Sequence, residues 1–228
     1  MKTSTLTFLL AAFLINLISC STNDDEPTVT TPSDSVTYLV TYNGQWTGSS
    51  HPIEYPDNSH FSGVIGMSHN KDTSLFENGS FASEGIKVMA ETGGKDPLTD
   101  EINAIIDNNL ANHLISEGGL STGSSSIQFT ITLVKDYPLV SLVSMIAPSP
   151  DWYVAIEGVN LLKSNDEWIE KLEVTPIHYD AGTDSGVTFK SPNSPTIPAK
   201  VISVITEAPL GNGTEVTPPL TTFTFEKQ

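Results

Sequence analysis

Alternation of apolar and polar side chains is the feature that most constrains how this chain folds. In residues 36–42 and 126–135, apolar side chains fall mainly on every second position. Successive side chains of a β-strand point to opposite faces, so both segments are predicted to be strands with one buried face. Residues 139–147 form another apolar run after a break at residues 136–138. So short a connection predicts that 126–135 and 139–147 pair as an antiparallel hairpin.

The remaining pattern indicates an all-β domain with a small helical insertion. Further strand candidates are residues 152–162, 168–179, 200–206 and 220–225. Helical spacing is confined to residues 83–110, where Ser83 opens a first amphipathic run and Asp96-Pro97 supplies the expected N-cap and first position of a second. Strand–helix–strand alternation is missing, which argues against a doubly wound sheet. About seven or eight strands predict an antiparallel β-sandwich of Greek-key type with a short inserted helical pair.

The charge balance narrows the range of partners. The 228 residues include 27 Asp and Glu, 10 Lys and no Arg, for a net charge of −17. A nucleic-acid binder needs a basic surface to replace the counterions around phosphate, so nucleic acid is not an expected partner. The chain has one cysteine. It therefore cannot form a disulfide within itself or a zinc site built on several cysteines.

The N-terminus has the layout of an export signal. Lys2 is followed by a largely apolar run over residues 6–18, which is too short for a comfortable membrane span. Residues 17–20 (LISC) resemble a bacterial lipobox. This implies that residues 1–19 are a lipoprotein signal peptide and that acyl chains on Cys20 anchor the protein to a membrane. The alternative is an ordinary signal peptide that happens to contain the sole cysteine.

Residues 20–35 are polar and contain two prolines, so they are predicted to be a flexible acidic tether. The acidic cluster at residues 24–26 resembles the export signal of surface lipoproteins in some bacteria. A solvated charge cluster is the alternative. Together these features predict a lipid-anchored protein of the bacterial outer membrane or cell surface, with its folded domain over residues 36–228.

Two short acidic segments carry the chemical interest of the domain. Asp151 follows a proline-rich turn and begins a predicted strand, while Asp180 and Asp184 lie in a glycine-containing loop after another strand. Glycines permit tight turns, so Asp180 and Asp184 can converge on one point. Calcium prefers six to eight oxygen ligands from carboxylates, carbonyls and water. The spacing does not match an EF-hand. The loop alone leaves two alternatives open, a calcium site and aspartates that only form side-chain turns.

Several segments of the chain resemble the spondin domain, a module shared by F-spondin and mindin. The segments that carry the likeness are residues 60–62, 65–66, 69–70, 81–85, 138–141 and 144–152. Residues 144–152 (SMIAPSPDW) are the most specific of them. The resemblance implies an eight-stranded antiparallel sandwich, similar to a C2 domain, with a calcium ion at one end. The positions that match the family's calcium-binding aspartates are Asp151, Asp180 and Asp184.

The predicted function is a non-catalytic, calcium-binding adhesion or ligand-binding module with a protein or glycan ligand. Animal members of the spondin family carry disulfides and thrombospondin-type repeats, and this chain has neither, so their partners are not transferred. The alternative is a surface hydrolase that acts on glycans or peptides with acidic catalytic residues. No His-Glu-x-x-His helix supports that alternative. Calcium-dependent melting with no turnover on a panel of glycans would favour the module, and turnover that is lost on mutating one acid would favour the hydrolase.

Overall fold

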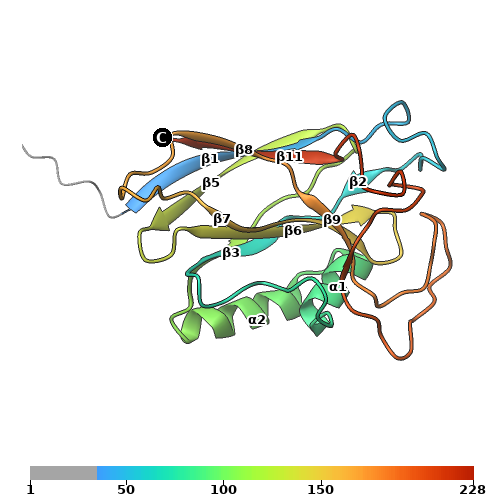
Figure 1. The fold of residues 1–228 in the computed structure, drawn as a ribbon, viewed down its shortest axis with the longest axis horizontal. Coiled ribbons are helices and arrows are strands. Elements are labelled where there is room, and N and C mark those ends of the chain that lie inside the picture. Colours follow the sequence, from blue (N-terminus) through green and yellow to red (C-terminus); the bar gives the residue numbers. More distant parts are fainter. Residues whose placement is uncertain (1–34) are drawn as a thin grey trace, which may run out of the picture. The chain divides into compact units, whose positions relative to one another are not determined.

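The structure, a computed structural model, describes residues 35–228, and these residues form three layers (Figure 1). The first layer is a four-stranded sheet, and the second is a seven-stranded sheet. Two helices form the third layer and cover the face of the second sheet that points away from the first. The predicted signal peptide, Cys20 and nearly all of the predicted tether lie outside the described residues. Within residues 35–228, no helix is long and apolar enough to cross a membrane.

All strand pairs that define the two sheets are antiparallel. In order across the first sheet, the strands are β5 (Ser126–Val134), β1 (Ser35–Gly44), β11 (Thr221–Lys227) and β8 (Lys171–Val174). In order across the second sheet, they are β10 (Ser203–Val204), β9 (Ile177–Asp180), β7 (Trp152–Asn160), β6 (Leu139–Ala147), β3 (Ile65–His69) and β4 (Ala111–Ser116), with β2 (His60–Phe61) paired to β6. The predicted antiparallel sandwich with a helical pair is therefore confirmed. The described part of the chain has eleven strands rather than eight, and two of them are only two residues long.

The alternating segments form neighbouring strands of the first sheet. β1 pairs with β5, and Tyr38 lies opposite Ile131 in the register. The inward residues of both strands are buried in the core between the two sheets. In the same core, the rings of Tyr42 and Phe223 stack with their centroids 4.4 Å apart. Alternation identified these strands because one face of the first sheet packs on the core and the other faces water.

The predicted hairpin of residues 126–135 and 139–147 is wrong. β5 belongs to the first sheet and β6 to the second, so the turn between them carries the chain from one sheet to the other. Every residue of β6 after Leu139 is buried. A strand covered on both faces has a continuous apolar run instead of alternation, and residues 139–147 have that pattern. The run therefore marked a strand of the doubly covered sheet and not the partner of β5.

Two other segments differ from their predictions. Residues 168–179 contain two strands, β8 and β9, which belong to different sheets. Pro176 lies between them and has no N–H group to donate to a sheet ladder. Within the predicted strand 200–206, only β10 forms. β3 and β4 were not predicted, because their short sequences lack a clear alternation.

The helical pair is confirmed as α1 (Glu84–Thr92) and α2 (Asp96–Asp107). The hydroxyl of Ser83 caps α1 by accepting the N–H of Ile86 at 3.1 Å. The cap of α2 is one residue earlier than predicted: Lys95 occupies it without a capping side-chain hydrogen bond, and Asp96 is the first helical residue. The buried side chains of both helices pack on the second sheet. They are Ile86, Met89, Ala90, Leu98 and Ile102.

Candidate functional site

Strand pairing brings the predicted aspartates to one end of the second sheet. β7 and β9 pair with Trp152 opposite Asp180. Asp151 directly precedes β7, and Asp180 is the last residue of β9. The N–H of Ala181 also donates to the carbonyl of Asp151 at 3.1 Å. Two residues that are far apart in the sequence therefore lie side by side at the start of the loop that contains Asp184.

Asp151 is fully buried, and its two carboxylate oxygens have different surroundings. Oδ2 accepts the N–H groups of Thr183 at 2.7 Å and Asp184 at 3.0 Å, and the hydroxyl of Thr183 at 3.2 Å. Oδ1 is buried and has no hydrogen-bond partner among the residues that the structure describes. A buried polar atom without a protein partner is costly, and such atoms commonly bind an ion or an ordered water.

Asp180 and Asp184 each stabilise the loop by accepting backbone N–H groups. Asp180 Oδ1 accepts the N–H of Gly182 at 2.8 Å. Asp184 Oδ1 accepts the N–H of Gly186 at 2.7 Å, and its Oδ2 accepts that of Ser194 at 2.8 Å. Gly182 has a φ of 74°, and a Cβ there would lie 2.5 Å from the carbonyl oxygen of Lys200. The side-chain turns expected as one alternative are thus present, and this glycine permits one of them.

The three carboxylates also act on one another electrostatically. Burial, and then the charge of Asp180, raise the pKa of Asp151 to about 6, although the bonds from Thr183 and Asp184 oppose the rise. Burial raises the pKa of Asp180 as well. The bond from Gly182, a side-chain bond with Trp152 and the charge of Lys200 lower it in turn, and the charge of Asp184 adds to the rise. A cation among these carboxylates would relieve both the burial and the repulsion.

The donor set fits a hard cation, although the ligands are not assembled around one point. A pocket of about 180 Å³ is lined by Asp180 and Asp184, with Lys200 at its side. All candidate donors are oxygens, which suits calcium. Within residues 35–228, no three His, Cys, Asp or Glu side chains form a group that could hold a metal ion as they stand. Binding would therefore require a small rearrangement of the side chains, starting from the unpartnered Oδ1 of Asp151.

Sequence reasoning missed the residues that hold the aspartates in place. Thr183 and Ser194 donate backbone N–H groups to Asp151 and Asp184. The indole of Trp152 bonds to the carboxylate of Asp180. Every residue except proline has a backbone N–H, so no residue type could have marked Thr183 or Ser194. Trp152 alone could have been suspected from the sequence, because it directly follows Asp151 and is the first residue of β7.

Two buried histidines, His69 and His178, lie in structural positions. His69 Nε2 is 2.8 Å from Ser141 Oγ, and that hydroxyl accepts the N–H of Gly158 at 2.9 Å. Ser141 is fully buried and His69 nearly so, so this serine–histidine pair is closed to a substrate. His178 Nε2 accepts the N–H of Leu220 at 3.2 Å in the core. These contacts join strands and loops, and none of them involves the three aspartates of the loop end.

A model of the Spondin_N family matches residues 36–213, a range that includes all three aspartates. The chain belongs to the spondin N-terminal domain family. It is 36% identical to Spondin-1 of Rattus norvegicus over 176 residues, which cover 74% of the chain and 22% of the rat protein. Spondin-1 of Homo sapiens gives the same identity and coverage. Spondin-2 of Homo sapiens is 33% identical over 175 residues, which cover 75% of the chain and 53% of that protein.

The spondin resemblance inferred from the short segments is thus confirmed. The matching region spans about a fifth of the length of Spondin-1 and about half that of Spondin-2. The comparison therefore establishes the family of this domain, while activities and partners that involve the rest of those spondins are not transferred.

Proposed function

We propose that this chain is a non-catalytic binding or adhesion module whose loop end holds a calcium ion on Asp151, Asp180 and Asp184. The observation that carries the proposal is the buried, unpartnered Oδ1 of Asp151 beside the half-buried carboxylate of Asp180. Leaving such an atom unsatisfied costs about 1–3 kcal/mol or more, and a divalent cation removes the cost. Membership of the spondin family supports the same three positions as ligands, as the resemblance implies.

The ion would order the loop end as well as neutralise it. Residues 183–196 form a closed loop in which Ser185 donates to the carbonyl of Ser194, and Thr196 donates to that of Thr183. Asp184 joins the two sides of this loop through the N–H of Ser194. A cation held by Asp151 and Asp184 would tie the loop to the start of β7. Metal occupancy and loop order are then coupled, and a ligand that touches the loop meets a rigid surface.

We propose further that acyl chains on Cys20 anchor the domain to a bacterial outer membrane or cell surface. The supporting features are the lipobox-like residues 17–20 and the polar segment that follows them. The domain would then present its loops to a protein or glycan ligand. Mass spectrometry of the membrane fraction tests the anchor: a diacylated or triacylated Cys20 is expected, and Cys20→Ala should release the chain from the membrane. A mature N-terminus at another residue would contradict the anchor.

Thermal melting tests the calcium site. Calcium at about a hundredfold above its dissociation constant should stabilise the folded chain by about 2.7 kcal/mol. For a chain of this length, that corresponds to a rise of about 5–10 °C in melting temperature relative to EGTA. Asp180→Ala should abolish the rise. Asp100→Ala removes the same charge from an exposed position in α2 and should retain it.

A melting temperature that is unchanged between calcium and EGTA would refute the calcium site. So would an equal rise in the wild-type chain and in Asp180→Ala. If Asp180→Ala does not fold, Asp180→Asn provides the same comparison, because its amide oxygen can still accept the N–H of Gly182. The non-catalytic part of the proposal predicts no turnover on glycan or peptide panels with calcium present.

A further inference from the structure

A groove of about 360 Å³ lies beside the aspartate end of the second sheet. It shares Asp180, Gly186, Val187 and Ser203 with the smaller pocket that Asp184 lines. Its remaining lining residues are Trp152, Val204, Ile205, Thr206, Glu207 and Ala208. Because Asp180 lines both spaces, the groove adjoins the proposed calcium site and extends beyond it along residues 204–208.

Part of the groove wall is apolar and faces water. Val187 is 72% exposed and Val204 is 42% exposed, and both are among the seven exposed large hydrophobic side chains of the described residues. Trp152, only 5% exposed, also lines the groove. Exposed aliphatic side chains that gather at a concave surface favour contact with the apolar part of a ligand.

The charged groups of the groove are all of one sign. Its lining includes the carboxylates of Asp180 and Glu207 and no Lys, Arg or His. Lys200 lines the smaller pocket instead. Glu207 is exposed, and its carboxylate accepts a long bond, 3.4 Å from the hydroxyl of Thr206. The groove thus combines an aliphatic wall with two carboxylates that can accept further hydrogen bonds.

We propose that this groove binds a lysine or arginine side chain presented by a protein partner. The aliphatic stem of such a side chain would lie against Val187 and Val204, and its cationic end would reach Asp180 and Glu207. Lys and Arg have this division between an apolar stem and a charged tip. The charge of the whole chain, −17, also attracts a basic partner surface. This inference deepens the proposed binding function by naming the class of group recognised.

Asp180 couples the groove to the calcium site. A calcium ion on Asp180 would remove much of the negative charge that the basic side chain meets there, leaving Glu207 as its main partner. Calcium should therefore weaken the binding of the basic side chain. By linkage, the side chain should weaken calcium binding by the same factor.

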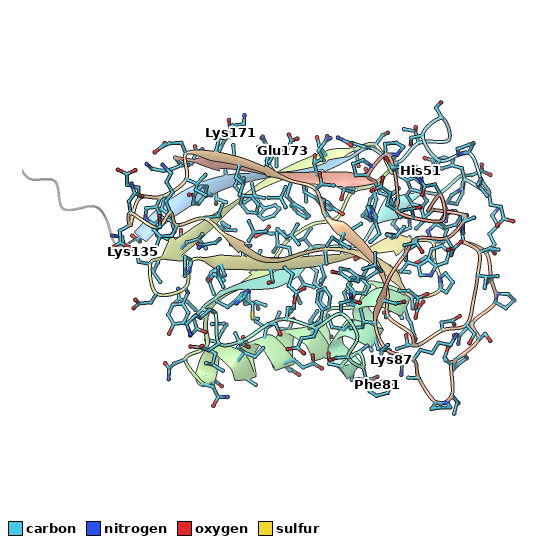
Figure 2. All side chains as sticks on the ribbon, in the orientation of Figure 1. His51, Phe81, Lys87, Lys135, Lys171 and Glu173 are labelled. Carbon is cyan, nitrogen blue, oxygen red and sulfur yellow. The ribbon has the colours of Figure 1, made fainter. Side chains whose placement is uncertain are left out.

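The test is a titration of the isotopically labelled full chain in EGTA with three capped tripeptides, Gly-Arg-Gly, Gly-citrulline-Gly and Gly-Glu-Gly. NMR signals of the methyl groups of Val187, Val204 and Ala208 report binding. The arginine peptide should shift these signals, and the other two should not. Glu207→Gln should weaken the arginine peptide about threefold, which is typical of one exposed ion pair. Glu173→Gln, which removes the same charge from β8 in the other sheet, should leave the affinity unchanged (Figure 2).

Three results would overturn the proposal. Equal binding of the citrulline peptide would show that charge is not recognised. An equal loss of affinity in Glu173→Gln would show attraction to the whole acidic chain rather than to this groove. Stronger shifts of the same methyl signals with a neutral oligosaccharide, such as cellotetraose, would assign the groove to glycans. Because the titration is done in EGTA, the effect of Glu207→Gln does not depend on calcium binding. If the calcium site does not exist, calcium will leave the affinity for the arginine peptide unchanged, and this result is separate from the effect of Glu207→Gln.

Discussion

The interior of the seven-stranded sheet and the aspartate end of the same sheet are stabilised in different ways. In the interior, side chains from β3, β6 and β7 pack against α1 and α2 on one face and against the first sheet on the other. At the end, three buried or half-buried carboxylates accept backbone N–H groups of the loop that follows β9. Apolar burial stabilises the interior, whereas hydrogen bonds and the charges of the carboxylates decide the stability of the end.

This difference teaches that the two regions respond to different conditions. Apolar burial changes little with pH or with added cations. Buried carboxylates that repel one another lose stability when they ionise and gain it when a cation binds. The loop end is therefore the part of the domain that solution conditions can order or loosen. Mutations in each region, measured at different pH values and calcium concentrations, can therefore distinguish the two sources of stability.

The largest change in the free energy of unfolding is expected for a mutation in the interior. Ile86 of α1 is fully buried against the second sheet. Ile86→Ala should lower the free energy of unfolding by about 3 kcal/mol, through lost transfer energy and the cavity left behind. Asn103→Ala, at an exposed position of α2, should change it by less than about 0.5 kcal/mol. Urea unfolding measures both, and the calcium-induced rise in melting temperature should persist in each. A loss of that rise in Ile86→Ala would contradict the separation of the two regions.

A smaller effect, of opposite sign, is expected at the loop end without calcium. The pKa of Asp151 is about 6 in the folded chain, above its ordinary value of 3.8. The folded state then holds the proton more tightly than the unfolded state, so this group's contribution to stability falls as pH rises from about 4 to about 6. Asp151→Asn removes the ionisation, and its amide oxygen can still accept the two loop N–H groups.

In EGTA, Asp151→Asn should therefore gain stability relative to the wild-type chain as pH rises from 4 to 7, by about 2 kcal/mol. The calcium-induced rise should disappear in the same variant. Urea unfolding at several pH values measures the gain, with Asp136→Asn in the exposed β5–β6 turn as the matched control. A difference between Asp151→Asn and the wild-type chain that does not change with pH would show that Asp151 is not strained by its burial.

The smallest expected change is in the pH dependence of stability, and it comes from a histidine in the interior. Burial lowers the pKa of His69 below its ordinary value of 6.5, although its backbone bonds oppose this. A histidine kept neutral in the folded state makes stability fall as pH drops below about 6.5, because the unfolded chain takes up the proton first. His69→Gln should reduce the fall in melting temperature between pH 7.5 and pH 5. His113→Gln in the edge strand β4 is the control, and an equal reduction there would contradict the role of His69.

The sequence predicted the parts of the fold in which one face meets water. β1 and β5 followed from alternation because their outer side chains are exposed or half-buried. The partner of β6 did not follow, because a strand buried on both faces has no alternation to set its neighbours. The separation of β8 and β9 into different sheets depends on the packing of the whole domain, and Pro176 was only a local hint of it.

For the candidate site, the three aspartates could be named from the sequence, but their contacts could not. Asp180 and Asp184 were marked by their glycines, and Asp151 by the proline-rich turn before it and by the resemblance to the spondin domain. The pairing of β7 with β9 that brings Asp151 to the loop is a long-range contact. The backbone donors of Thr183 and Ser194 carry no residue-specific signal. The groove that includes Glu207 arises from segments that no motif connects.

A crystal structure of the chain grown with calcium tests the central claim most directly. The account predicts one density peak at the loop end, with carboxylate oxygens of Asp151, Asp180 and Asp184 at about 2.3–2.6 Å from it. The Oδ1 atom of Asp151 should be among those ligands. A structure at millimolar calcium in which that atom remains without a partner, and no ion lies near Asp180, would contradict the account.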